Sequence, residues 1–171
     1  MEEAPRVLDG EQKIGNDMRL ASRNESMGFA ERTKKNLQHV QKAFDAGHDV
    51  HVVTQVVNSL LGLVVFPWES HLDEVVQAMP LAELGRQGWP RWEITKGSCA
   101  TVGELIRHLR NGASHRDIWF SSDDRDAGEV TIEVRDRKKG APEPYWDARL
   151  NANEVRQFCL RFISLVEETV G

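Results

Sequence analysis

Four segments of the sequence repeat apolar residues at the three-to-four-residue spacing of an amphipathic helix, and this pattern constrains the fold more than any other feature. The segments cover residues 26–47, 49–66, 101–113 and 151–171. The last is the clearest, because Val155, Phe158, Phe162 and Val166 keep one helix face apolar. The second is apolar nearly all round, which favours a helix at the centre of a bundle or in a dimer interface. The sequence therefore predicts a mainly α fold.

Capping residues mark where two of these helices begin. Thr101 followed by Glu104 fits a capping box, and Asn151 followed by Glu154 fits the start of the last helix. Residues 1–24 mix charged residues, glycine and asparagine without sustained periodicity. We therefore expect a flexible leader over residues 1–24 and a single helical domain over residues 25–171.

Short extended segments are expected over residues 118–121, 129–135 and 145–150. In the second of them, Val130, Ile132 and Val134 alternate strictly with polar residues. Before the helix that starts at Thr101, we expect a short helix over residues 72–78 and an irregular loop pinned by Trp89 and Trp92. The overall prediction is a four- to five-helix bundle with a small antiparallel β insertion between the last two helices.

Composition excludes several classes of protein. Hydrophobic residues make up 40% of the chain and charged residues 29%, which is a globular balance. A net charge of −5 argues against a surface that binds nucleic acid throughout, so any such contact must be local. Two cysteines and no secretory signal favour a cytoplasmic protein, and no apolar stretch is long enough to suggest a membrane span.

The histidines and cysteines lack the spacing of known metal sites. There is no HExxH motif, no paired CxxC motif and no glycine-rich phosphate loop. We expect neither a metal ion nor a cofactor.

Residues 107–117 hold the densest group of reactive side chains. Arg110 offers a charged fork that matches phosphate oxygens, and the imidazole of His115 can take up or release a proton. Asn111 precedes His115 by four residues and shares its helix face, from where it can orient the imidazole or touch a substrate. Arg110, Asn111 and His115 are therefore the candidate catalytic residues of a metal-free RNA cleavage.

Helix geometry limits this site. Five residues along a straight helix rotate a side chain by about 140°, so Arg110 and His115 would not touch. Either Gly112 loosens the helix before His115, or two subunits pool their residues, and we expect both. The alternative is that both residues are solvated helix-end side chains, favoured by the helix dipole.

Basic residues near this segment are candidates for RNA binding. Arg107 and Arg116 flank the candidate catalytic residues. A second basic run precedes the turn residue Gly140 and could form a hairpin tip that grips phosphates; its members are Arg135, Arg137, Lys138 and Lys139. The alternative for this run is a solvated turn.

The segment from Arg110 to His115, with Asn111 after the arginine, resembles the Arg, Asn and His signature of the HEPN superfamily. Three further segments are similar to a bacterial, plasmid-borne HEPN branch: Phe29–Thr33, Asn58–Leu63 and Phe66–Glu69. The resemblance spans roughly residues 29–170. The β insertion after His115 departs from the minimal HEPN bundle.

This resemblance implies a homodimeric, metal-independent RNA endonuclease, in which Arg110 and His115 from two protomers meet across the interface. Members of the superfamily often act as toxins or defence components, so an antitoxin protein is a further expected partner. The alternative is a non-catalytic helical module that binds RNA or protein, for example within a toxin and antitoxin pair. A purely structural dimer is the third possibility.

Overall fold

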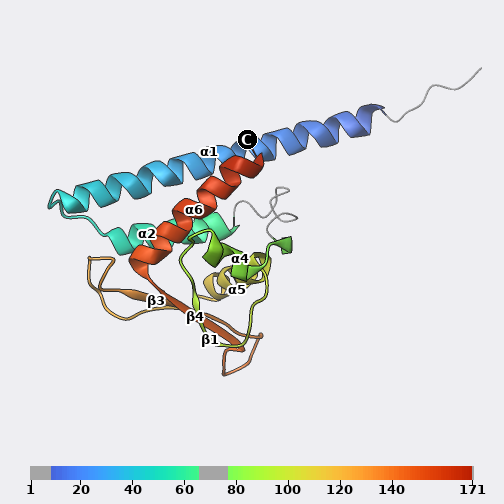
Figure 1. Ribbon diagram of the computed structural model, residues 1–171. Helices are drawn as coiled ribbons and strands as arrows, with labels where there is room; N and C mark the ends of the chain where they lie inside the picture. The colour runs from blue at the N-terminus through green and yellow to red at the C-terminus, as the bar shows by residue number, and fades with distance from the viewer. Residues whose placement is uncertain (1–8, 66–76, 171) are drawn as a thin grey trace, which may run out of the picture.

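The computed structural model describes residues 9–65 and 77–170 (Figure 1). In this part of the chain the helices are α1 (Asp9–Asp45), α2 (Val52–Val65), α4 (Leu81–Arg86), α5 (Val102–Ser114) and α6 (Ala152–Val170). The strands are β1 (Glu93–Lys96), β2 (Ile118–Phe120), β3 (Thr131–Asp136) and β4 (Trp146–Asn151). A mainly α chain with a small antiparallel sheet is thus confirmed, although the arrangement differs in detail.

The helices pack together on one face of the sheet. Figure 1 shows α1 lying across α6 and α2, with the sheet at the opposite end of the molecule. The strands follow the order β1-β4-β3-β2, and every neighbouring pair is antiparallel. Along β3, Ile132, Val134 and Asp136 are buried and face the helices, while Glu133 and Arg135 alternate with them on the other face. The end of β3 is therefore placed against α5, which contacts it directly.

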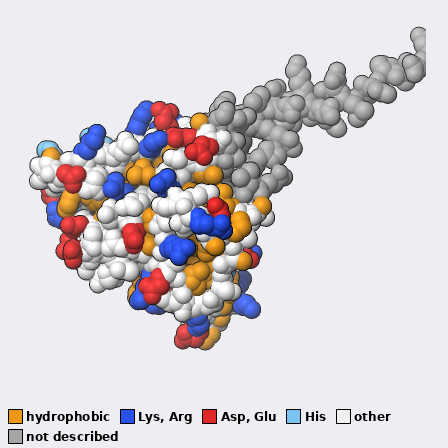
Figure 2. All heavy atoms as spheres, in the orientation of Figure 1, with side chains coloured by type: hydrophobic (Ala, Val, Ile, Leu, Met, Phe, Trp, Pro, Cys, Tyr) orange, Lys and Arg blue, Asp and Glu red, His pale blue; other side chains and the backbone are white. Residues whose placement is uncertain are grey.

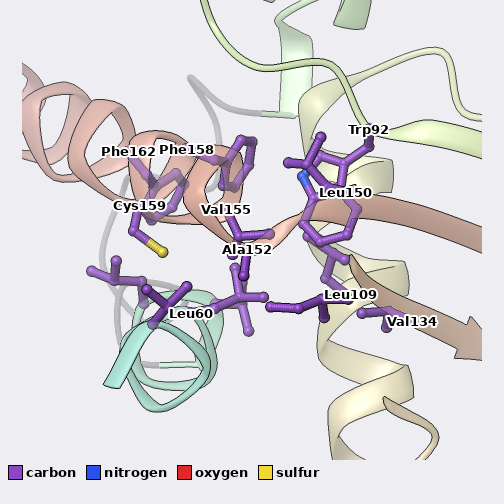
Figure 3. Close-up of a cluster of buried hydrophobic side chains, with 14 of the residues drawn as sticks. Leu60, Trp92, Leu109, Val134, Leu150, Ala152, Val155, Phe158, Cys159 and Phe162 are labelled. Carbon is purple, nitrogen blue, oxygen red and sulfur yellow. The ribbon is translucent and has the colours of Figure 1, made fainter. Parts of the chain in front are cut away.

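The core is centred on the apolar face of α6. Phe158 is almost completely buried, and the rings of Trp89 and Trp92 meet it edge-on at centroid distances of 5.4 and 6.0 Å. Leu60 of α2 and Leu109 of α5 contribute to the same cluster (Figure 3). Burial of one large apolar side chain contributes roughly 1.5–3 kcal/mol. The apolar stripe of α6 and the pinning role of Trp89 are as predicted.

Both predicted helix starts are confirmed. The backbone N–H of Glu104 donates to the Thr101 hydroxyl at 3.1 Å, and the Glu104 carboxylate accepts from the Thr101 N–H at 3.4 Å. At the start of α6, the Asn151 side-chain oxygen accepts from the backbone N–H of Asn153 at 2.9 Å. These bonds satisfy backbone donors that lack partners within the helix.

The first helix begins earlier than its apolar stripe. α1 is helical from Asp9, so residues 9–24, expected to form a loose leader, continue the helix. The reason is local propensity, since this stretch holds Glu, Gln, Lys, Met, Arg and Leu, which are good helix formers without any periodicity.

Two further elements were not predicted. α4 stands where an irregular loop was expected, and it begins just after Pro80, whose fixed φ of −62° is compatible with a helix start. β1 pairs with β4 and precedes α5, so the sheet is not confined to the interval between the last two helices. The segment Phe66–Glu69 and most of the helix expected over residues 72–78 lie outside the described residues.

No helix within the described residues is both long enough and apolar enough to span a bilayer.

Candidate functional site

Helix α5 stays regular up to the candidate site. The helix ends at Ser114, His115 is its C-cap, and the backbone N–H of His115 donates to the Asn111 carbonyl at 3.0 Å. The expectation that Gly112 loosens the helix is therefore wrong. A Cβ added to Gly112 would lie 2.5 Å from Val134 Cγ1 and 2.7 Å from the Arg135 carbonyl oxygen. Gly112 instead allows α5 to pack directly on β3.

The chain leaves α5 through a tight turn. Asp117 N–H donates to the Gly112 carbonyl at 2.9 Å, and Arg116 N–H donates to the Ala113 carbonyl at 3.1 Å. This is the Schellman pattern, in which the residue after the cap is left-handed and usually glycine. Arg116 occupies that position with φ 58°. A left-handed backbone at a residue with a side chain costs about 1 kcal/mol or more, so the surrounding structure must hold this turn in place.

Arg110 and His115 both face solvent on the last turns of α5. The Arg110 carbonyl accepts from the Ser114 hydroxyl at 2.9 Å. Within the described residues, the Arg110 guanidinium takes part in no salt bridge.

Asn111 is bound to a buried carboxylate. Its side-chain nitrogen donates to Asp136 Oδ2 at 3.0 Å, and the Tyr145 hydroxyl donates to the same oxygen at 2.5 Å. His108 Nδ1 also lies 2.8 Å from Asp136 Oδ2, and because a carboxylate only accepts, that nitrogen carries the proton. Asp136 is 1% exposed. Three donors compensate for burying the carboxylate, which would otherwise be unfavourable.

Aromatic rings enclose this carboxylate. The His108 ring is stacked on Trp146 at a centroid distance of 4.6 Å and meets Tyr145 edge-on at 5.7 Å. Burial, together with the hydrogen bond to Asp136 and the charge of that carboxylate, raises the pKa of Tyr145 above its usual value. The hydroxyl therefore remains a donor throughout the neutral pH range. Asn111 is fixed from its buried side by a rigid polar cluster.

Sequence reasoning did not include His108, Asp136 or Tyr145 in the site. The sequence does contain one indication for Asp136. This residue continues the alternation of Val130, Ile132 and Val134, and so it falls on the inward face of its strand. An aspartate at a core position must find donors nearby. His108 and Asn111, three residues apart on one helix face, are suitable donors.

The predicted basic hairpin divides into two groups. Arg135 pairs with Glu133 and lies 3.5 Å from an Asp147 carboxylate oxygen, and Arg137 pairs with Asp117. Burial alone would raise the pKa of Asp117, but hydrogen bonds from Arg137 and Trp119 outweigh burial and lower it. These two arginines are held by acidic partners on the outer side of the sheet.

The remaining basic candidates are exposed, and they form no salt bridge within the described part of the chain; they are Arg107, Arg116, Lys138 and Lys139. Gly140 is left-handed at φ 79°, as expected of a turn residue. Figure 2 shows acidic and basic side chains interspersed on the visible face, in keeping with a chain whose basic contacts must be local. Among the described residues, no group of three or more His, Cys, Asp or Glu side chains is arranged to hold a metal ion.

A helical bundle packed on a small antiparallel sheet, together with the match of a HEPN family model, defines the chain as a HEPN-type domain. More specifically, the family HEPN pEK499 p136 matches residues 14–171, and the chain belongs to this plasmid-associated branch of the superfamily. No curated protein and no solved structure gives a significant match.

Proposed function

We propose that the protein is a metal-independent endoribonuclease of the HEPN type, a cytoplasmic homodimer that cleaves single-stranded or loop RNA as a toxin or defence component. One observation carries this proposal: in a chain of this family, Arg110 and His115 both face solvent at the end of one helix. Unpaired RNA is the expected substrate because its backbone and bases can be reached by side chains.

In the proposed reaction, the ribose 2′-oxygen attacks the adjacent phosphorus and the bond to the 5′-oxygen breaks. His115 takes the proton from the 2′-hydroxyl or gives one to the leaving oxygen, a role that typically contributes ~10²–10⁴ in rate. Arg110 binds the charge that builds on the phosphate oxygens. Asn111, tied to Asp136, keeps this turn of α5 in place.

A second subunit is part of the proposal because α5 is straight. Arg110 and His115 point about 140° apart around the helix axis, so one helix does not direct both at the same phosphate. With the helix intact at Gly112, a two-fold axis near the end of α5 is the remaining way to bring Arg110 of one protomer to His115 of the other.

The test compares purified protein with its Arg110→Ala and His115→Ala variants on labelled RNA in EDTA. Both variants should lose cleavage, while His39→Ala, which changes an exposed histidine of α1, should keep it. Mixing the two inactive variants should then restore about a quarter of the activity, since half of the dimers become mixed and each has one intact shared site. Full activity in either single variant contradicts the proposal.

A non-catalytic binding module is the second candidate, and the outer face of the sheet favours it. Trp119 is 53% exposed there and borders a groove of about 640 Å³ in which Arg149 pairs with Glu93. Exposed tryptophan and arginine side chains are common at protein interfaces, so a protein such as an antitoxin is the partner that this face would suit. Absence of RNA cleavage by the folded protein in the same assay would favour this candidate.

A further inference from the structure

Tyr145 is the only tyrosine of the chain, and its ring is held rigidly at the surface. The residue is 41% exposed, yet its hydroxyl is bound to the buried Asp136 and its ring packs against His108. A solvent-facing aromatic ring fixed by a buried anchor loses little conformational entropy when it binds a ligand. No role in the fold or in the proposed chemistry requires its exposed surface.

The ring lies beside the face of α5 that carries Asn111 and Arg107. Asp136 binds both Tyr145 and Asn111, and His115 follows Asn111 by four residues, on the same side of the helix. Arg107 precedes Asn111 by one helical turn, so the two share a face. The positive charge of Arg107 is close enough to oppose the rise in the pKa of Tyr145.

We propose that Tyr145 is a nucleobase-stacking residue, on which an unpaired base of the RNA lies beside the phosphate to be cleaved. This inference rests on the proposed function and narrows its substrate to RNA with an unstacked base at the cleavage point. Every base has a flat π face, so stacking on tyrosine tolerates any sequence. The ring would position the strand, while Arg110 and His115 act on the phosphate.

The charges around the ring suit a nucleotide. Lys138 Nζ lies 5.9 Å from the ring centroid, and its exposed, flexible side chain can move from the ring to a phosphate. The acidic neighbour Glu143 faces Lys96 at 3.9 Å. The negative charge of Asp136 is buried and shared among three donors. The exposed surface beside Tyr145 is therefore locally basic, although the whole chain is acidic.

Trp119 is a matched control, because it is an exposed ring of similar accessibility in different surroundings. Its indole N–H donates to Asp117 at 2.9 Å, and the Arg135 guanidinium carbon lies 5.0 Å from its ring centroid. Arg135 is itself paired with Glu133. The cation beside this ring is thus neutralised by its own acidic partner, and this surface has little attraction for phosphate.

The test uses a single-stranded RNA oligonucleotide that carries 2-aminopurine, whose fluorescence is quenched when it stacks. Binding is measured in EDTA in a His115→Ala background, so that the RNA stays intact. Adding Tyr145→Leu should weaken binding by about 5- to 100-fold and abolish the quenching, because the stacking surface is gone. Trp119→Leu should leave the dissociation constant and the quenching within about two-fold of the parent, since the Trp119 ring is not expected to stack on the RNA.

Tyr145→Phe keeps the ring and removes the hydroxyl, so it should retain most of the quenching. This variant covers the case in which Tyr145→Leu fails to fold, as judged by circular dichroism. The inference is overturned if a folded Tyr145→Leu protein binds and quenches like the parent, if Tyr145→Phe loses quenching completely, or if the parent binds no single-stranded RNA.

Cleavage and stacking can fail separately. Quenching that depends on Tyr145 in a protein that never cleaves RNA would refute the nuclease and leave the stacking role standing. If cleavage depends on Arg110 and His115 but the quenching is the same with and without the Tyr145 ring, the stacking role alone is refuted.

Discussion

Replacing Gly112 by alanine should destabilise the protein, although alanine is normally the better helix residue. The new Cβ would lie 2.5 Å from Val134 Cγ1, whereas carbon atoms pack best at about 3.5–4.0 Å, so α5 and β3 must separate by about 1 Å. Neither neighbour can yield easily. Val134 is buried with a stiff branched side chain, and the second close atom, the Arg135 oxygen, belongs to the backbone of the strand.

The magnitude follows from three contributions. Overpacking costs about 1–3 kcal/mol, and a shift of 1 Å would break the 3.0 Å hydrogen bond from Asn111 to Asp136, which costs about 1.5–3 kcal/mol more. The higher helix propensity of alanine offsets at most about 1 kcal/mol of this destabilisation. We therefore expect Gly112→Ala to lower the free energy of unfolding by about 1.5–5 kcal/mol.

Urea unfolding followed by circular dichroism measures this effect at a fixed protein concentration. With a slope of about 2 kcal/mol per molar urea, the midpoint should fall by about 0.8–2.5 M. Gly28→Ala is the matched control in α1, because its new Cβ meets only the side-chain end of Arg32, at 3.1 Å. That variant should gain up to about 1 kcal/mol. A Gly112→Ala midpoint at or above that of the wild type would refute the packing argument.

Two further predictions concern the acidic turn and the core. Asp117 forms an ion pair with Arg137, and its pKa is lowered in the folded state. The ion pair therefore stabilises the fold fully at pH values above the unfolded-state pKa of about 3.9. This stabilisation is lost as the pH falls through the pKa of Asp117 in the folded state. The stability advantage of the wild type over Asp117→Asn, measured by urea unfolding, should therefore shrink below about pH 4; an equal advantage at pH 3 and pH 7 would contradict this. Phe158→Ala should lower the free energy of unfolding by about 3–5 kcal/mol and alter the near-ultraviolet circular dichroism of Trp89 and Trp92. A decrease in the free energy of unfolding of less than about 1 kcal/mol would contradict this, because it would mean that the neighbouring side chains fill the space of the lost ring.

Local patterns predicted most of the helices and strands well. The capping box at Thr101, the apolar face of α6 and the strict alternation through Val134 each depend on residues a few positions apart, and the structure confirms all three. The same reasoning missed the start of α1, where helix propensity acts without periodicity. It also missed β1, whose pairing with β4 joins residues more than fifty positions apart.

The candidate site was predicted only in part for the same reason. The Arg110 to His115 segment is contiguous, so its chemistry can be read directly from the sequence. The packing role of Gly112 depends on the close approach of Val134 and Arg135 from another element. No spacing rule within one helix contains that contact.

By itself, the sequence determined most of the helical segments and which residues face the core, because these follow from periods of two and of three to four residues. It also shows directly which short segment carries the arginine and the histidine. The tertiary structure alone decided that Asp136 gathers His108, Asn111 and Tyr145 at one buried oxygen. It also separated Arg137, which pairs with Asp117, from the exposed Lys138. Such contacts depend on strand register and on the packing of α5 against β3, which bring together residues that no local period relates.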